Sequence, residues 1–96
     1  MMSNVISSLK ARELVEKGAQ LIDVRTEVEY SQGCLPGATN LPVTSLEHLS
    51  SKLDQSKALI VYCRTGGRSA QAKQILDNQG FSTVHNIGSM ANFSND

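Results

Sequence analysis

The chain has 96 residues, 40% hydrophobic and 19% charged, which fits one globular domain and excludes a disordered one. Its nine basic and nine acidic residues cancel, so nothing indicates nucleic acid or a membrane surface as a partner. No apolar run has the length of a signal peptide or a membrane span, and two cysteines are too few for a disulfide-stapled secreted domain. We therefore expect a single cytoplasmic domain over residues 1–96, monomeric and with free thiols.

The sequence predicts, in chain order, strand 4–7, helix 8–17, strand 21–24, helix 26–33, strand 39–41, helix 45–53, strand 58–62, helix 69–78, strand 83–87 and a short helix near residues 90–93. Ser8 and Ser45 are placed to cap their helices, and Leu9 is expected on the buried side of the first. Thr26 and Glu29 have the spacing of a capping box.

Strands and helices alternate with short connections throughout this order. Alternation of this kind is typical of an α/β domain with a mostly parallel central sheet and helices on both faces. The run 58–62 (ALIVY) is the most apolar strand, as expected for a central strand buried on both faces. Ligands bind such sheets beyond the carboxyl ends of the strands, which directs attention to the residues that follow this run.

Residues 62–69 read YCRTGGRS, which places Cys63 at the carboxyl end of the central strand. Gly66 and Gly67 allow the backbone to fold tightly and turn its N–H groups inward, and the next helix adds its own free N–H groups. A thiolate in such a cradle is stabilised, so we expect a lowered pKa for Cys63, with Arg64 and Arg68 adding positive charge. The alternative is that Cys63 is a small buried hydrophobe, which leaves the glycines and arginines unexplained.

Three separate blocks resemble the rhodanese-like family of sulfurtransferases. They are residues 21–25 (LIDVR) followed by Glu29 and Tyr30, residues 33–38 (GCLPGA), and residues 61–69 (VYCRTGGRS). The blocks occur in the family's order and the resemblance covers nearly the whole chain, so the rhodanese-like fold is the expected one.

The resemblance implies that Cys63 is the catalytic residue. It would take the outer sulfur of a small anionic donor such as thiosulfate, carry it as a persulfide, and pass it to a thiol or to cyanide. Asp23 and Arg25 match an Asp-x-Arg pair that supports the architecture around the loop. The expected substrate-binding residues are those of the loop: Arg64, Thr65, Gly66, Gly67, Arg68 and Ser69. No cluster has metal-ligand spacing, and we expect neither a metal nor another cofactor.

Two alternatives stay open at this point. The domain could be a sulfur-relay or binding module that exchanges sulfur with a protein persulfide or a thioredoxin-like partner. It could also be a cysteine phosphatase on the same fold, although four residues between Cys63 and Arg68 make a loop one residue shorter than the phosphatase loop.

The chain departs from the family pattern in two places. Cys34 stands where a histidine is common, either as a neutral substitution in a turn or as a second thiol that resolves the Cys63 persulfide into a disulfide. Phe93 stands in a tail where a tryptophan is frequent, so we expect looser packing there. The two histidines, His48 and His85, have no triad-like neighbours in the sequence and are expected to be structural or exposed.

Overall fold

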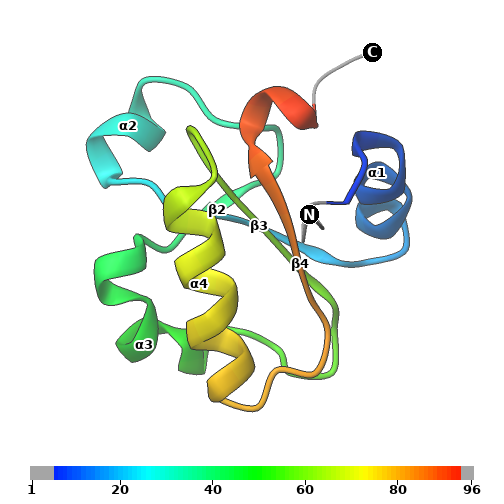
Figure 1. Ribbon diagram of the computed structural model, residues 1–96, viewed down its shortest axis with the longest axis vertical. Helices are drawn as coiled ribbons and strands as arrows, with labels where there is room; N and C mark the ends of the chain where they lie inside the picture. Colours follow the sequence, from blue (N-terminus) through cyan, green and yellow to red (C-terminus); the bar gives the residue numbers. More distant parts are fainter. Residues whose placement is uncertain (1–5, 94–96) are drawn as a thin grey trace.

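The computed structural model describes residues 6–93. Its sheet has the order β2-β1-β3-β4, and every pair is parallel (Figure 1). The strands are β1 (Gln20–Asp23), β2 (Thr39–Asn40), β3 (Leu59–Cys63) and β4 (Val84–Ser89). β3 has neighbours on both sides and all of its residues are buried, as the apolar run predicted. The predicted α/β fold with a parallel sheet is therefore confirmed.

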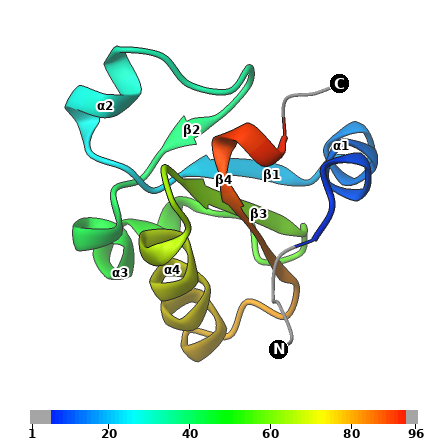
Figure 2. The ribbon, with the colours of Figure 1, turned by 45° about the horizontal axis from the view of Figure 1, so that its top comes forward.

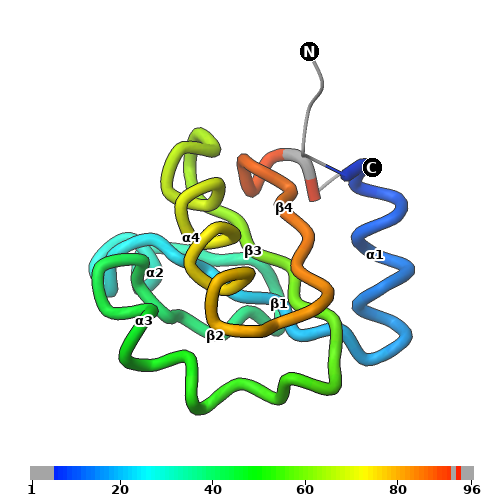
Figure 3. The backbone as a smooth tube through the Cα atoms, turned by 60° about the horizontal axis from the view of Figure 1, so that its bottom comes forward, coloured from blue at the N-terminus to red at the C-terminus, as the bar shows by residue number. Residues whose placement is uncertain are grey.

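Helices cover both faces of this sheet (Figures 2 and 3). The helical elements are α1 (Ser8–Glu16), α2 (Glu27–Ser31), η1 (Val43–Ser45), α3 (Leu46–Leu49), η2 (Ser50–Lys52), α4 (Gly67–Asn78) and η3 (Met90–Asn92). α3 and α4 pack on one face and α1 on the other, which gives two separate apolar clusters. Because side chains alternate along a strand, Val61 and Cys63 join the cluster under α4, whereas Ile60 and Tyr62 join the one under α1.

Near the N-terminus the structure corrects three predictions. Ser7, and not Ser8, caps α1, because its hydroxyl accepts a hydrogen bond from the Lys10 N–H at 3.1 Å. Leu9 is 70% exposed, and Ala11 is the residue of α1 that is buried in the apolar cluster on this face of the sheet. Of the predicted strand 4–7, residues 4 and 5 lie outside the described residues, and residues 6 and 7 form no strand. Ile6 nevertheless donates a backbone hydrogen bond to Asn86 of β4.

The predicted helix 45–53 is observed as α3 followed by η2, with η1 ending at Ser45, and Ser45 makes no side-chain cap. The Ser50 hydroxyl lies within hydrogen-bond distance of two acceptors, the Gln79 Oε1 and the Glu47 carbonyl, the latter at 3.1 Å. A bond to this carbonyl competes with regular helix bonds. Leu53 N–H then bonds the Ser50 carbonyl in a tighter turn. By contrast, the predicted capping box of Thr26 and Glu29 is confirmed at the start of α2. Within residues 6–93, no helix is both long and apolar enough to cross a membrane.

Candidate active site

Cys63 ends β3, and the chain turns over its sulfur before α4 begins at Gly67. Gly66 makes this turn with φ of 106°, a left-handed conformation that glycine adopts without strain. α4 therefore starts two residues earlier than predicted, and Ser69 falls in its first turn. The Cys63 Sγ accepts hydrogen bonds from the N–H groups of Gly66 at 2.9 Å and Ser69 at 3.4 Å. The N–H cradle expected from the sequence is thus present in residues 63–69, called the cysteine loop below.

The cradle determines the acidity of the thiol. Burial alone would raise the pKa of Cys63, because this side chain is fully inaccessible to solvent. Hydrogen bonds from the Ser69 hydroxyl and N–H, and from the N–H groups of Gly66 and Thr65, outweigh burial, so the pKa lies below its usual value. The Ser69 oxygen lies 3.6 Å from Sγ. The loop thus favours the thiolate, which is the reactive form of cysteine.

Arg68 has a partner that the sequence did not reveal. Its guanidinium makes two hydrogen bonds to the Glu29 carboxylate, at 2.7 and 3.0 Å, which join the cysteine loop to α2. This contact is the main cause that lowers the pKa of Glu29 to about 2. Glu29 also completes the capping box through the Thr26 N–H, so one carboxylate holds both the helix and the loop. The bond between Glu29 and Arg68 joins residues 39 positions apart, so no local pattern in the sequence predicts it.

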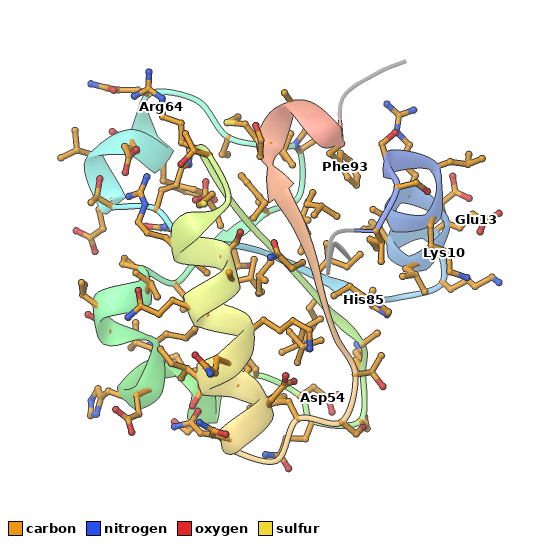
Figure 4. All side chains as sticks on the ribbon, viewed as in Figure 1. Lys10, Glu13, Asp54, Arg64, His85 and Phe93 are labelled. Carbon is orange, nitrogen blue, oxygen red and sulfur yellow. The ribbon has the colours of Figure 1, made fainter. Side chains whose placement is uncertain are left out.

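Arg64 is the exposed cation of the loop and lies beside α2 (Figure 4). Among residues 6–93 no hydrogen bond or ion pair engages its guanidinium. It lines a pocket of about 450 Å³ at this end of the molecule. The other lining residues are Arg25, Glu29, Gln32, Gly33, Cys34 and Met90. Cys63 is not among them, because the cysteine loop covers its sulfur.

The Asp-x-Arg pair forms a buried ion pair behind this pocket. The Arg25 Nη2 lies 2.7 Å from the Asp23 carboxylate, and its Nε donates to the same group at 2.9 Å. The same Nη2 donates to the Gly33 carbonyl at 2.7 Å. The pair thus holds the chain that forms the pocket wall, an arrangement consistent with the supporting role predicted for Asp23 and Arg25.

Tyr62 completes this support and was missed in the sequence. Its hydroxyl donates to Asp23 at 2.8 Å and accepts from the Leu35 N–H at 3.0 Å. Residues 33–35, called the wall segment below, are thus held at both ends, by Arg25 and by Tyr62. A signal was available: a tyrosine inside a buried strand needs a partner for its hydroxyl.

The two histidines belong to other elements: His48 lies in α3, and His85 lies in β4, away from Arg64 (Figure 4). Within the described part of the chain, no group of three or more histidine, cysteine or acidic side chains is arranged to hold a metal ion. The cysteine loop, the pocket and the wall segment therefore make up the candidate site.

Together these features define an α/β protein in which a parallel strand, a tight glycine turn and a helix start hold a cysteine sulfur ready for ionisation. Residues 7–96 match the rhodanese-like domain, and the chain belongs to that family. It is 38% identical over 88 residues to the thiosulfate sulfurtransferase GlpE of Coxiella burnetii, with 91% of this chain and 82% of that protein covered. At the level of the family, this supports a rhodanese-type sulfurtransferase.

Solved structures agree with this assignment. The human single-domain sulfurtransferase TSTD1 superposes with a TM-score of 0.75 at 28% identity, over 88% of each chain. A rhodanese with anions from E. coli gives a TM-score of 0.74 at 31% identity, over 82% of this chain and 95% of that one.

Proposed function

We propose that the protein transfers a sulfane sulfur from thiosulfate to a thiol or cyanide, with Cys63 as the sulfur carrier. The observation that carries this proposal is the pair of N–H groups, from Gly66 and Ser69, that point at the Cys63 sulfur. They favour a thiolate before the reaction, and the same loop dipoles favour the anionic persulfide after it.

The reaction divides into two half-reactions, so we expect ping-pong kinetics. In the first, the Cys63 thiolate attacks the outer sulfur of thiosulfate. A new S–S bond forms, the S–S bond of the donor breaks, and sulfite leaves with its electron pair. In the second, cyanide or a thiolate attacks the outer sulfur of the persulfide. Thiocyanate or an acceptor persulfide leaves, and the Cys63 thiolate is restored.

Arg64 is our choice for the residue that attracts the donor. It is exposed, it lines the pocket next to the cysteine loop, and no carboxylate in residues 6–93 engages it. Arg68, which the sequence also suggested for this role, is held by Glu29 and would have to leave that ion pair to reach a substrate. The names of two relatives fit an anionic sulfur donor, since one is a thiosulfate sulfurtransferase and the other a rhodanese with anions.

Access to the sulfur requires a movement of the loop. Cys63 has no exposed surface, whereas Arg64, Thr65 and Gly67 around it are exposed. The Gly66–Gly67 pair is the natural place for this movement, because glycine loses no side-chain packing when the backbone rotates. The donor would then enter from the pocket side, where Arg64 lies.

Intact mass spectrometry before and after thiosulfate treatment tests the proposal. The native protein should gain about 32 Da, one sulfur atom carried as a persulfide, and lose it again when cyanide is added. Cys63→Ser should not gain this mass, although it keeps Cys34. A gain in Cys63→Ser, or no gain in a folded native protein, would contradict the proposal. An aryl-phosphate assay on the same samples tests the phosphatase alternative.

A further inference from the structure

The second cysteine of the chain lies at the same pocket. Cys34 is exposed and lines the pocket together with Arg64, the residue directly after Cys63. Its two neighbours are fixed, because the Gly33 carbonyl accepts from Arg25 and the Leu35 N–H donates to Tyr62. The wall segment therefore presents Cys34 at a defined position beside the cysteine loop.

The Cys34 side chain also has a defined neighbour. The Tyr30 hydroxyl donates to the Ala38 carbonyl at 2.7 Å, so its single proton is in use. Burial first, and then the charge and hydrogen bond of Cys34, raise the pKa of Tyr30. The Cys34 thiol therefore lies close enough to Tyr30 to affect the ionisation of that tyrosine.

The two cysteines differ in solvent exposure, which determines which sulfur acceptors can reach them. Cys63 is fully buried, whereas Cys34 is exposed. A persulfide on Cys63 suits a donor or acceptor as small as thiosulfate or cyanide. The thiol of a large acceptor, such as another protein, meets the surface of the cysteine loop first. Sulfur on Cys34 would be within reach of such an acceptor without any opening of the loop.

We propose that Cys34 is a second sulfur carrier, which receives the sulfane sulfur from Cys63 and presents it to bulky thiol acceptors. This inference rests on the proposed function, because it needs a persulfide on Cys63. The Cys34 thiolate attacks the outer sulfur of that persulfide. A Cys34 persulfide forms, the S–S bond at Cys63 breaks, and the Cys63 thiolate leaves with the electron pair. The Cys34 proton passes to solvent or to the departing thiolate, and no oxidant or reductant is consumed.

Attack on the outer sulfur is favoured over the disulfide route. A disulfide would require Cys34 to reach the inner sulfur, Cys63 Sγ, which is inaccessible and enclosed by the N–H groups of Gly66 and Ser69. The outer sulfur lies about 2 Å farther out, at the end of the S–S bond. After transfer, Arg64 at the same pocket is the guanidinium available to pair with the anionic Cys34 persulfide.

Peptide-level mass spectrometry can follow the sulfur, because tryptic cleavage separates the cysteines into peptides 26–52 and 58–64. The protein is treated with thiosulfate, freed of excess donor, sampled over time, blocked with an alkylating reagent and digested. The gain of about 32 Da should appear first on the Cys63 peptide and then on the Cys34 peptide. Cys63→Ser should show the gain on neither peptide, and Cys34→Ser should still show it on Cys63.

A displaced thiol provides the matched control. Ser82 is exposed and precedes β4, at the opposite end of the sheet, so Cys34→Ser with Ser82→Cys keeps one exposed thiol but moves it away from the pocket. We expect no sulfur on the displaced thiol of this variant, and a yield on native Cys34 that does not change when the protein is diluted. Loading of Cys63 without any gain on Cys34, or a disulfide between the two peptides, would overturn the inference and leave the proposed function intact. Absence of sulfur from Cys63 would instead remove the proposed function.

Discussion

Ser69→Ala isolates the contribution of one hydroxyl to the reactivity of Cys63. In the thiol form, Cys63 donates toward the Ser69 oxygen at 3.6 Å, while the Ser69 hydroxyl donates to the Gly66 carbonyl at 3.1 Å. In the thiolate form, the hydroxyl can turn toward the sulfur, because the Gly66 carbonyl keeps a second donor, the Ala70 N–H at 3.1 Å. The substitution removes the contacts of the hydroxyl in the thiol form and the stronger bond that favours the thiolate, while the Gly66 carbonyl keeps its bond from the Ala70 N–H.

The magnitude follows from this geometry. A hydrogen bond to a charged group contributes about 1.5–3 kcal/mol, and the long oxygen–sulfur distance argues for the lower end. Because about 1.4 kcal/mol corresponds to a factor of ten, persulfide formation should slow roughly tenfold wherever the thiol is mainly protonated. The sign is fixed: the fold lowers the pKa of Cys63, partly through Ser69, so removal of the hydroxyl raises it. The rate profile should shift toward alkaline pH, and the loss should vanish at high pH.

Stopped-flow or quenched mass spectrometry of the first half-reaction, over a range of pH, measures this profile. The thermal midpoint of Ser69→Ala serves as the check on folding, and Ser82→Ala, at an exposed serine far from the loop, serves as the control. An unchanged profile midpoint with an equal rate loss at every pH would refute the argument, because the hydroxyl would then act on something other than ionisation.

Three further outcomes are expected. Tyr62→Phe leaves the buried Leu35 N–H without an acceptor, a cost of about 1–3 kcal/mol, so calorimetry should show a midpoint at least about 4 °C lower; an unchanged midpoint would contradict it. Glu29 contributes stability above its ordinary pKa that is lost as pH falls from 4.5 toward about 2, so acid should destabilise Glu29→Gln less steeply than the native protein in thermal melts; parallel melts would contradict this. Arg64→Ala should raise the KM for thiosulfate several-fold at low salt, whereas exposed Lys57→Ala should not; equal effects would assign donor binding elsewhere.

Local patterns in the sequence were sufficient for the strands and for the cysteine loop. The run 58–62 is apolar throughout because both faces of β3 are buried. A continuous apolar run without alternation is typical of a central strand, and it identified β3 correctly. Gly66 identified the turn, since its positive φ is a conformation that few other residues adopt. Both signals lie within a few residues of the feature that they predict, and for that reason the sequence could reveal them.

The contacts between distant segments could not be predicted in this way. The ion pair of Arg68 with Glu29, which lies 39 positions earlier, had no local signal, and the substrate-binding role predicted for Arg68 stays a prediction. Tyr62 was read only as part of an apolar strand, although its hydroxyl joins Asp23 to the wall segment. A local pattern can also mislead. Ser45 has the spacing of a helix cap but makes no capping bond, and the helix that follows it is interrupted at Ser50. Pairing of this kind depends on how the elements meet, which no local window contains.

The distribution of charge explains how a chain of zero net charge can attract an anion at one place. Arg25 and Arg64 line the pocket, and Arg68 binds the Glu29 that also lines it. Asp23 neutralises Arg25, and Glu29 neutralises Arg68. Both of these arginines are held in ion pairs, so the proposed function assigns the attraction of the donor to Arg64. A phosphatase needs a loop arginine that grips the phosphate, and here the arginine at that end of the loop is turned away to α2. This arrangement supports our proposal of a small sulfur donor, recognised by one guanidinium and by the N–H groups of the loop, over the phosphatase alternative.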